Sequence, residues 1–405
     1  MTESALILAC VRAHYNSKDL VDVTRRASDG VAWSKVLSIA RRHGIAPLVY
    51  ESLARGLQLW PEDALTELRR DFRQSAANSF LYAAELVRLS NHLQQRSIAA
   101  LAFKGPTLAL LLYGQLSLRT IRDLDLLVAE DQIDPALSAL QQCGYEPVSG
   151  LGGARPSVSG RIRKHILLVH HARRFAVELH WAIAESSFAF PLRFQDVWTE
   201  RHTVMVMEQP VATLSREHMF LMMCAHGTNH CWGSLKWICD IAQAVSRSPD
   251  LDWHQLLARA RALGCHRMLS VGLALARDIC GVQLPAELES CAGTEKVHKI
   301  CADIQERLFA DREPVAYLER TLTFVRSRER FLDRIRILLC FIVPELKPKA
   351  GDLALIRLPN VLRILSFPLR LVRIFLFRWK RTVRPIAKSA LDWRQPGSLA
   401  ANRPD

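Results

Sequence analysis

The sequence predicts an α/β (α+β) fold in which a small mixed β-sheet core is flanked by N- and C-terminal helical regions. Before residue 95 and after residue 215, apolar residues recur every three to four positions, which is typical of helices. Between these regions, short apolar runs alternate with glycine and proline turns, which is typical of strands. With 49% hydrophobic and 23% charged residues, the chain is neither disordered nor a polytopic membrane protein.

The length of 405 residues exceeds that of a usual single domain of about 100–200 residues. We therefore expect four parts. They are an N-terminal helical region over 1–95, the sheet core over 96–215, a C-terminal helical region over 216–320, and a basic amphipathic tail over 321–405.

The tail carries nearly all of the net charge of +14, because residues 320–388 hold 17 basic and 4 acidic residues. Its long apolar stretches, Leu332–Val343 and Val361–Phe377, contain regularly placed arginines. This pattern favours helices that lie in a membrane interface and contact anionic headgroups. A nucleic-acid-binding arm fits less well because so many residues are apolar, and a helical extension packed on the core remains open.

Ten scattered cysteines without a C-x-x-C pair indicate a reducing compartment. The apolar start, Met1–Val11, has no basic residue before it, so we expect no secretory signal. No window of about 18 apolar residues is free of charge, so we expect no membrane-spanning helix. These features predict a cytoplasmic protein, and the tail would attach it peripherally to the inner face of the membrane.

The sheet core begins with a strand, helix and strand. The apolar run Ile98–Phe103 ends at Lys104-Gly105-Pro106, where a proline can occupy the first turn of a helix. We expect a short helix over Thr107–Tyr113 that Gly114 ends. Polar and apolar residues then alternate over Asp123–Val128, as in a half-buried strand.

The remaining expected elements are, in chain order, a helix over Asp134–Cys143, a strand over Gly144–Val148, a loop over Ser149–Ser159, a hairpin of Ile166–His170 with Phe175–Trp181, a hairpin of His202–Met207 with Val211–Leu214, and helices from a cap at Ser215 to about residue 310. Because side chains alternate along a strand, Glu178 and His180 share one face of the first hairpin.

Asp123 and Asp125 are one residue apart on a strand, so both carboxylates point to the same face. Such a pair repels unless a cation or water compensates its charge, and Mg²⁺ binds one or two carboxylates together with substrate phosphates. Glu178 is the candidate third carboxylate on a neighbouring strand. The Gly105 turn can present backbone N–H groups to a phosphate, and Lys104 adds a positive charge. This combination is typical of phosphoryl transfer.

The chain also resembles a known family. The resemblance extends over roughly residues 33–275 and rests on Leu101-Ala-Phe-Lys-Gly-Pro-Thr-Leu-Ala109, Tyr113-Gly114, Arg119, Arg122-Asp-Leu-Asp-Leu-Leu-Val128, Val177-Glu-Leu-His-Trp181, His226, His230, Trp232, Leu235-Lys-Trp237 and Asp240. In these positions it is similar to the bacterial uncharacterised nucleotidyltransferases of the DNA-polymerase-β-like superfamily.

The resemblance implies an enzyme that moves a nucleoside monophosphate from an NTP to an unidentified acceptor hydroxyl, with Mg²⁺ or Mn²⁺ as cofactor. By analogy, it also implies a link to envelope polysaccharide synthesis. Asp123, Asp125 and Glu178 would be the catalytic metal ligands, and Gly105 would occupy the phosphate turn. The residues themselves make Lys104, Arg119, Arg122 and His180 further candidates for nucleotide binding, and His180 could equally orient a carboxylate or cap the strand face. The superfamily usually has Gly-Ser or Gly-Gly at the turn, whereas here Pro106 supplies no N–H group. The two arginines are equally ordinary ion-pair partners for nearby carboxylates.

Two other functions remain open from the sequence: a non-catalytic nucleotide-binding or scaffold protein on the same fold, and a toxin-like nucleotidyltransferase. A zinc site at His226, His230 and Cys231 is disfavoured because no fourth ligand has suitable spacing. We expect this helix face to line the cleft or to pack in the core.

Overall fold

The computed structural model describes residues 2–16, 20–27, 30–55, 60–148, 164–183, 192–310 and 317–346. The expected loop over Ser149–Ser159 and the apolar run Val361–Phe377 lie outside these ranges.

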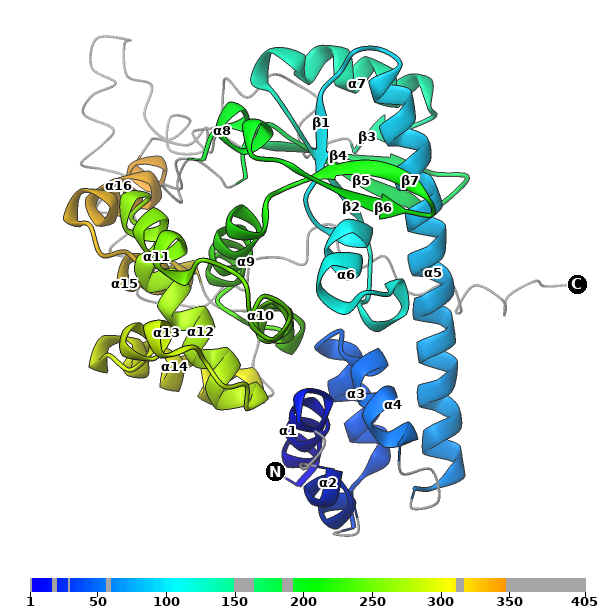
Figure 1. Cartoon of the computed structure of the whole chain (residues 1–405), viewed down its shortest axis with the longest axis vertical. Coiled ribbons are helices and arrows are strands. Elements are labelled where there is room, and N and C mark those ends of the chain that lie inside the picture. The colour runs from blue at the N-terminus through cyan, green and yellow to red at the C-terminus, as the bar shows by residue number, and fades with distance from the viewer. Residues whose placement is uncertain are drawn as a thin grey trace, which may run out of the picture.

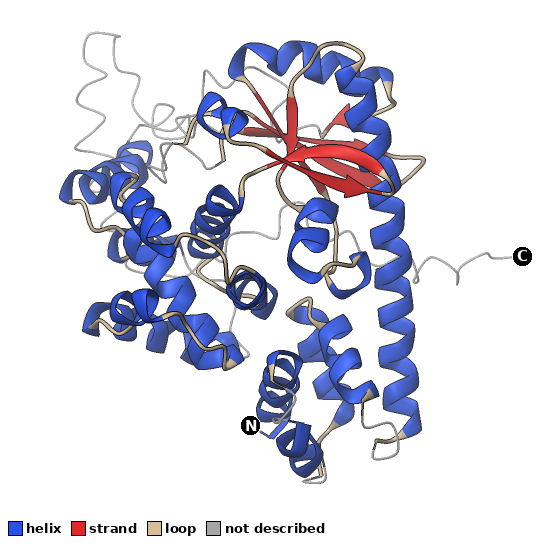
Figure 2. Ribbon diagram, viewed as in Figure 1, coloured by secondary structure: helices blue, strands red, loops and turns tan. Residues whose placement is uncertain are grey.

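A five-stranded mixed sheet lies in the upper part of the molecule in Figure 2, and most of the helices lie below it. Its strand order is β1 (Ala100–Ala102), β2 (Leu124–Val128), β5 (Phe175–His180), β4 (His165–His170) and β3 (Glu146–Pro147). Strands β2 and β5 are parallel, and the other neighbours are antiparallel. The first hairpin predicted from the sequence is confirmed as β4 and β5. The second is confirmed as a separate two-stranded sheet of β6 (His202–Val206) and β7 (Gln209–Thr213).

Three helices lie around the central sheet. Helix α6 (Gly105–Tyr113) connects β1 to β2 and ends at Gly114, whose φ of 72° is the left-handed conformation expected of a glycine C-cap. Helix α7 (Ile133–Gln142) lies above the sheet in Figure 1, and the long α5 (Glu62–Gln94) runs beside it. The strand, helix and strand predicted at residues 98–128 are therefore present.

Helices make up the rest of the described chain, as predicted. The N-terminal region holds α1 (Thr2–Tyr15), α2 (Leu20–Ala27), α3 (Trp33–Arg42) and α4 (Ala46–Ala54), and a short α8 (Phe194–Thr199) precedes β6. After the sheet follow α9 (Arg216–Asn229), α10 (Leu235–Arg247), α11 (Trp253–Ala262), α12 (His266–Cys280), α13 (Ala286–Ala292), α14 (Glu295–Leu308), α15 (Tyr317–Arg326) and α16 (Phe331–Leu346). The predicted cap is present, because the Ser215 hydroxyl accepts a hydrogen bond from the backbone N–H of His218.

Two apolar clusters hold these elements together. One joins the N-terminal helices to α9–α14, so the two helical regions share a core. The other lies between the sheet, α7 and the second half of α5. Helix α5 belongs to both, since Leu68 packs in the first cluster and Leu86 in the second.

Strand β2 is buried along its whole length, so the expectation of a half-buried strand is wrong. Leu124 and Leu126 pack in the sheet cluster, whereas Leu127, on the opposite face, packs in the cluster of the helical regions. Asp125 lies on the same face as Leu127 and is only 3% exposed.

In the described part of the tail, some apolar side chains are buried in the core and others are exposed to solvent. Phe324 of α15 and Ile337 of α16 are buried in the helical core. On the outer face of α16, Leu332 is 77% and Leu339 52% exposed. No helix in the described ranges is both long enough and apolar enough to cross a bilayer.

Candidate functional site

Strands β2 and β5 bring two of the predicted carboxylates side by side. In their parallel register Asp125 is paired with Glu178, so both side chains point to the same face of the sheet. Asp123 lies two residues before Asp125, directly ahead of β2, and therefore belongs to the same face. We call these three residues the carboxylate cluster.

The Lys104-Gly105-Pro106 turn lies against the start of β2. Gly105 has a φ of 61°, and a Cβ atom added to it would lie 3.3 Å from the carbonyl oxygen of Asp123. Glycine therefore permits both the left-handed backbone and the close approach. The Thr107 hydroxyl lies 3.0 Å from the carbonyl oxygens of Ala102 and Lys104, which fixes the end of β1 to the first turn of α6.

Lys104 forms an ion pair inside the cluster. Its Nζ donates a hydrogen bond of 2.6 Å to Asp125 Oδ1. Burial lowers the pKa of Lys104, but the charges of Asp125, Glu178 and Asp123 outweigh this effect and hold the pKa above its ordinary value. In the structure, Lys104 thus supplies part of the positive charge that the carboxylates need.

His180 lies between two of the carboxylates. Its Nε2 lies 3.1 Å from Asp125 Oδ1 and 3.1 Å from Glu178 Oε2, and the residue is 7% exposed. Burial lowers the pKa of the imidazole, but the hydrogen bonds to both carboxylates outweigh burial and raise it. His180 therefore links the two strands through contacts with both carboxylates, and these carboxylates favour its protonated form.

The three carboxylates differ in their affinity for protons. Burial and repulsion by Asp125 and Glu178 raise the pKa of Asp123 to about 6. Burial also raises the pKa of Asp125, but Lys104 and His180 outweigh it and hold the carboxyl well below its usual range. Negative charge at Asp123 is thus incompletely balanced by the protein. Their oxygen atoms are the donor type that Mg²⁺ or Mn²⁺ binds, although the three carboxylates are not among the described groups that lie close enough together to hold an ion as the site stands.

Helices α9 and α10 lie on the same side of the sheet as α6 (Figure 1). His226 and His230 of α9 lie near each other, with ring centroids 4.5 Å apart, and both contact the ring of Trp237 on α10. Burial lowers the pKa of His226, and Lys104 lowers it further. Burial and Arg320 lower the pKa of His230 to about 3. Both imidazoles are therefore neutral, and together with the indole they form an aromatic surface near Lys104.

Among the described residues, His226, His230 and Cys231 do not form a group that could hold a metal ion.

Arg119 and Arg122 lie in different surroundings. The Arg119 guanidinium is buried and donates three hydrogen bonds of 3.0–3.1 Å to both carboxylate oxygens of Asp240 on α10. The Tyr113 hydroxyl donates a fourth to the same carboxylate. Arg119 therefore joins the sheet core to the C-terminal helices through an ion pair. Arg122 is exposed beside the cluster.

Two residues of this site were not singled out as site residues from the sequence. His165 on β4 is the cross-strand partner of His180, which the register of the predicted hairpin could have revealed. Lys236 on α10 lies in Leu235-Lys-Trp237, one of the segments that resemble the family, but nothing in the sequence indicated that it belongs to the site. Burial and then Arg119 lower the pKa of Lys236 to about 8, whereas the nearby Asp123 raises it. Lys236 is thus a further cation near the carboxylates.

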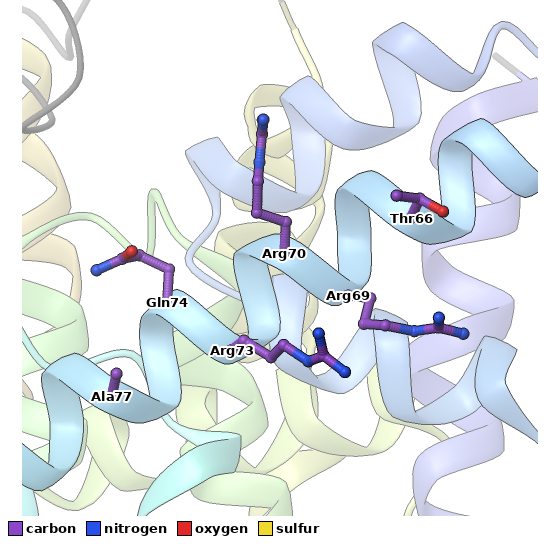
Figure 3. A pocket seen from close by; sticks show the side chains of 6 residues that line it. All are labelled: Thr66, Arg69, Arg70, Arg73, Gln74 and Ala77. Carbon is purple, nitrogen blue, oxygen red and sulfur yellow. The ribbon is translucent and has the colours of Figure 1, made fainter.

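A separate basic hollow lies on the outer surface of α5. Its lining residues are Thr66, Arg69, Arg70, Arg73, Gln74 and Ala77. Figure 3 shows that Arg69 and Arg73 extend to one side of the helix and that Arg70 extends to the other. The hollow offers donors for an anion but none of the carboxylates that metal-dependent phosphoryl transfer requires.

Comparison with known proteins gives few relatives. No curated protein matches the chain. A crystal structure of an antigenic nucleotidyltransferase-like protein from Paracoccidioides brasiliensis shares 21% identity, with a TM-score of 0.31, over 46% of this chain and 87% of that one. The family model described as uncharacterised nucleotidyltransferase matches residues 29–281, more than half of the chain. By this match, the chain belongs to the uncharacterised nucleotidyltransferase family.

Proposed function

We propose that the protein is a Mg²⁺- or Mn²⁺-dependent nucleotidyltransferase that transfers a nucleoside monophosphate from an NTP to an acceptor hydroxyl. The observation that carries this proposal is the pairing of Asp125 with Glu178 across β2 and β5, with Asp123 at the same end of the sheet and the Gly105 turn against it. In the reaction, the acceptor oxygen bonds to the α-phosphorus, the bond to the pyrophosphate oxygen breaks, and the acceptor hydroxyl loses its proton.

Asp123, Asp125 and Glu178 would hold the divalent ion, which supplies charge compensation for the triphosphate. Glu178 is either the third ligand of the ion or the base that accepts the acceptor's proton, and it is less buried than Asp125. Lys104 donates a hydrogen bond to Asp125. Once a metal ion balances the charge of Asp125, a phosphate oxygen can take the place of this carboxylate as the partner of Lys104. The Gly105 turn orients the phosphates with the N–H groups at the start of α6, of which Pro106 contributes none.

The first test measures NTP binding with and without Mg²⁺ for the wild type, Asp123→Asn and Asp125→Asn. Both variants keep the side-chain volume and remove one negative charge. We expect them to lose Mg²⁺-dependent binding, and we expect Asp131→Asn, which changes an exposed carboxylate beyond the strand, to bind as the wild type does. The proposal is wrong if no NTP binds the wild type with Mg²⁺ or Mn²⁺.

Transfer itself is tested by incubating the protein with each labelled NTP and a cell extract. A labelled product that requires Asp123 identifies the acceptor. Binding without any labelled product would favour the non-catalytic alternative. Growth inhibition on expression that Asp123→Ala relieves would favour a toxin-like transferase.

We also propose that α16 attaches the protein to an anionic membrane surface. Phe331, Leu332 and Leu339 are exposed on one face of this helix, and Arg336 is exposed beside them. The 59 residues that follow α16 are rich in arginine and in large apolar residues. Apolar side chains next to arginines match an interface where headgroups are negative and acyl chains begin.

Flotation with phosphatidylcholine vesicles, with and without phosphatidylglycerol, tests this attachment. We expect binding that requires the anionic lipid and that weakens at least about tenfold in Leu332→Glu/Leu339→Glu, since burial of one leucine side chain contributes about 1.5–3 kcal/mol. Leu81→Glu changes an equally exposed leucine on α5 and is the control. Equal binding by both variants would contradict the assignment to α16.

A further inference from the structure

We propose that His165, Glu178 and His180 form a binding site for a transition-metal ion of the Zn²⁺ type, beside the carboxylate cluster. We call these three residues the histidine site. The inference shares Glu178 with the proposed function but requires neither NTP binding nor turnover.

The hairpin register assembles the histidine site. His165 on β4 lies directly opposite His180 on β5, and Glu178 lies two residues before His180, so all three side chains point to one face of the sheet. The rings of the two histidines have centroids 5.1 Å apart. Each of the three residues offers one ligand atom, and these atoms lie within 4.8 Å of one another. Within the described ranges no other group of three such side chains, the carboxylate cluster included, meets this distance.

The distances suit a small ion after minor side-chain movement. Zn²⁺ binds nitrogen and oxygen ligands at about 2.0–2.2 Å, so two ligand atoms of a tetrahedral site are about 3.4 Å apart. His180 Nε2 and Glu178 Oε2 are already 3.1 Å apart. His165 and Glu178 are only partly buried, so their side chains can close the remaining separation without repacking the core.

The ligand types separate this site from the carboxylate cluster. Two imidazoles and one carboxylate are a ligand set that Zn²⁺ takes when its fourth position stays open for water or substrate. Mg²⁺ prefers oxygen ligands and keeps several waters. The same end of the sheet therefore offers an oxygen-rich position at Asp123 and Asp125 and a nitrogen-rich position at His165 and His180, with Glu178 between them.

Occupancy would change the contacts of the carboxylate cluster. His180 Nε2 now lies within hydrogen-bond distance of Asp125 and Glu178. A nitrogen that coordinates a metal ion has no lone pair or proton left for these carboxylates. An ion in the histidine site would thus release Asp125 from His180 and bind Glu178 in place of that hydrogen bond.

The test is a titration of the metal-free, full-length protein with Zn²⁺ by calorimetry and with Co²⁺ by visible absorption. We expect one ion per chain and a nitrogen-ligated Co²⁺ spectrum. His165→Ala should weaken binding by at least about 10- to 100-fold, which is the loss expected from a residue that only orients a ligand. His171→Ala, which removes an exposed histidine from the turn of the same hairpin, is the matched control and should bind as the wild type does.

Two further variants separate this proposal from the proposed function. Asp123→Asn should lose Mg²⁺-dependent NTP binding and keep the Co²⁺ spectrum, whereas Glu178→Gln should weaken both. The proposal is overturned if the wild type binds neither Zn²⁺ nor Co²⁺. It is also overturned if His165→Ala binds as tightly as the wild type, or if His226→Ala, on α9, abolishes the spectrum while His165→Ala keeps it.

Discussion

The buried ion pair between Arg119 and Asp240 gives the sharpest prediction about stability. Asp240→Asn keeps the volume of the side chain and removes its charge. Arg119 then stays buried without a counter-charge, and the three hydrogen bonds to the carboxylate oxygens lose their ionic acceptor. Removing one partner of a buried pair costs about 3–5 kcal/mol, most of it because the other charge remains unpaired. We expect a loss of this size in the free energy of unfolding.

Urea unfolding followed by circular dichroism measures this loss. A second variant, Arg119→Met/Asp240→Leu, removes both charges and should recover most of the stability, because a well-packed apolar pair often equals a buried ion pair. A control is Asp250→Asn, which breaks the exposed pair with Arg216 and should cost at most about 1 kcal/mol. A loss below about 1 kcal/mol for Asp240→Asn, or a double variant less stable than the single one, would refute the reasoning.

Gly105→Ala should lower the free energy of unfolding by more than Gly30→Ala does. Both glycines have a φ near +65°, which costs an alanine about 1–2 kcal/mol, but only at Gly105 would the added Cβ lie 3.3 Å from the Asp123 carbonyl oxygen. Equal losses in urea would show that this contact relaxes freely. Lys236 should make stability depend on pH above neutrality, because burial lowers its folded-state pKa to about 8 from 10.5. Between these values the unfolded state binds the extra proton, so this lysine makes the protein more stable as pH rises. The stability difference between wild type and Lys236→Met should show this slope, and a flat difference across the window would contradict it.

Much of the sheet core follows from local sequence. Gly105 and Gly114 mark both ends of α6, and alternation within Phe175–His180 places Glu178 and His180 on one face. These features depend on backbone geometry and on the period of two along a strand, which neighbouring residues determine. The same locality explains why the two hairpins were predicted at nearly their observed bounds.

The surroundings of the site depend on contacts that are distant in sequence. Asp125 was expected on a half-exposed face, and it is buried beside Lys104, 21 residues before it, and His180, 55 residues after it. Arg119 was a candidate phosphate ligand, and its partner Asp240 is 121 residues away. Spacing and periodicity do not encode such pairs. The pairing of Asp125 with Glu178 was anticipated only because a third carboxylate was sought on a neighbouring strand.

The packing of helix α5 in both apolar clusters has a consequence for how the protein unfolds. Its 33 residues extend about 50 Å as one unbroken rod. Its first half packs in the cluster of the helical regions through Leu68, and its second half packs in the sheet cluster through Leu86. Unfolding of either apolar cluster removes the packing of one half of α5. We therefore expect the two clusters to unfold together in one cooperative transition. Hydrogen exchange should accordingly show similar protection at both halves of the helix, and slower exchange there than at the exposed Glu62 and Asp63 at its start.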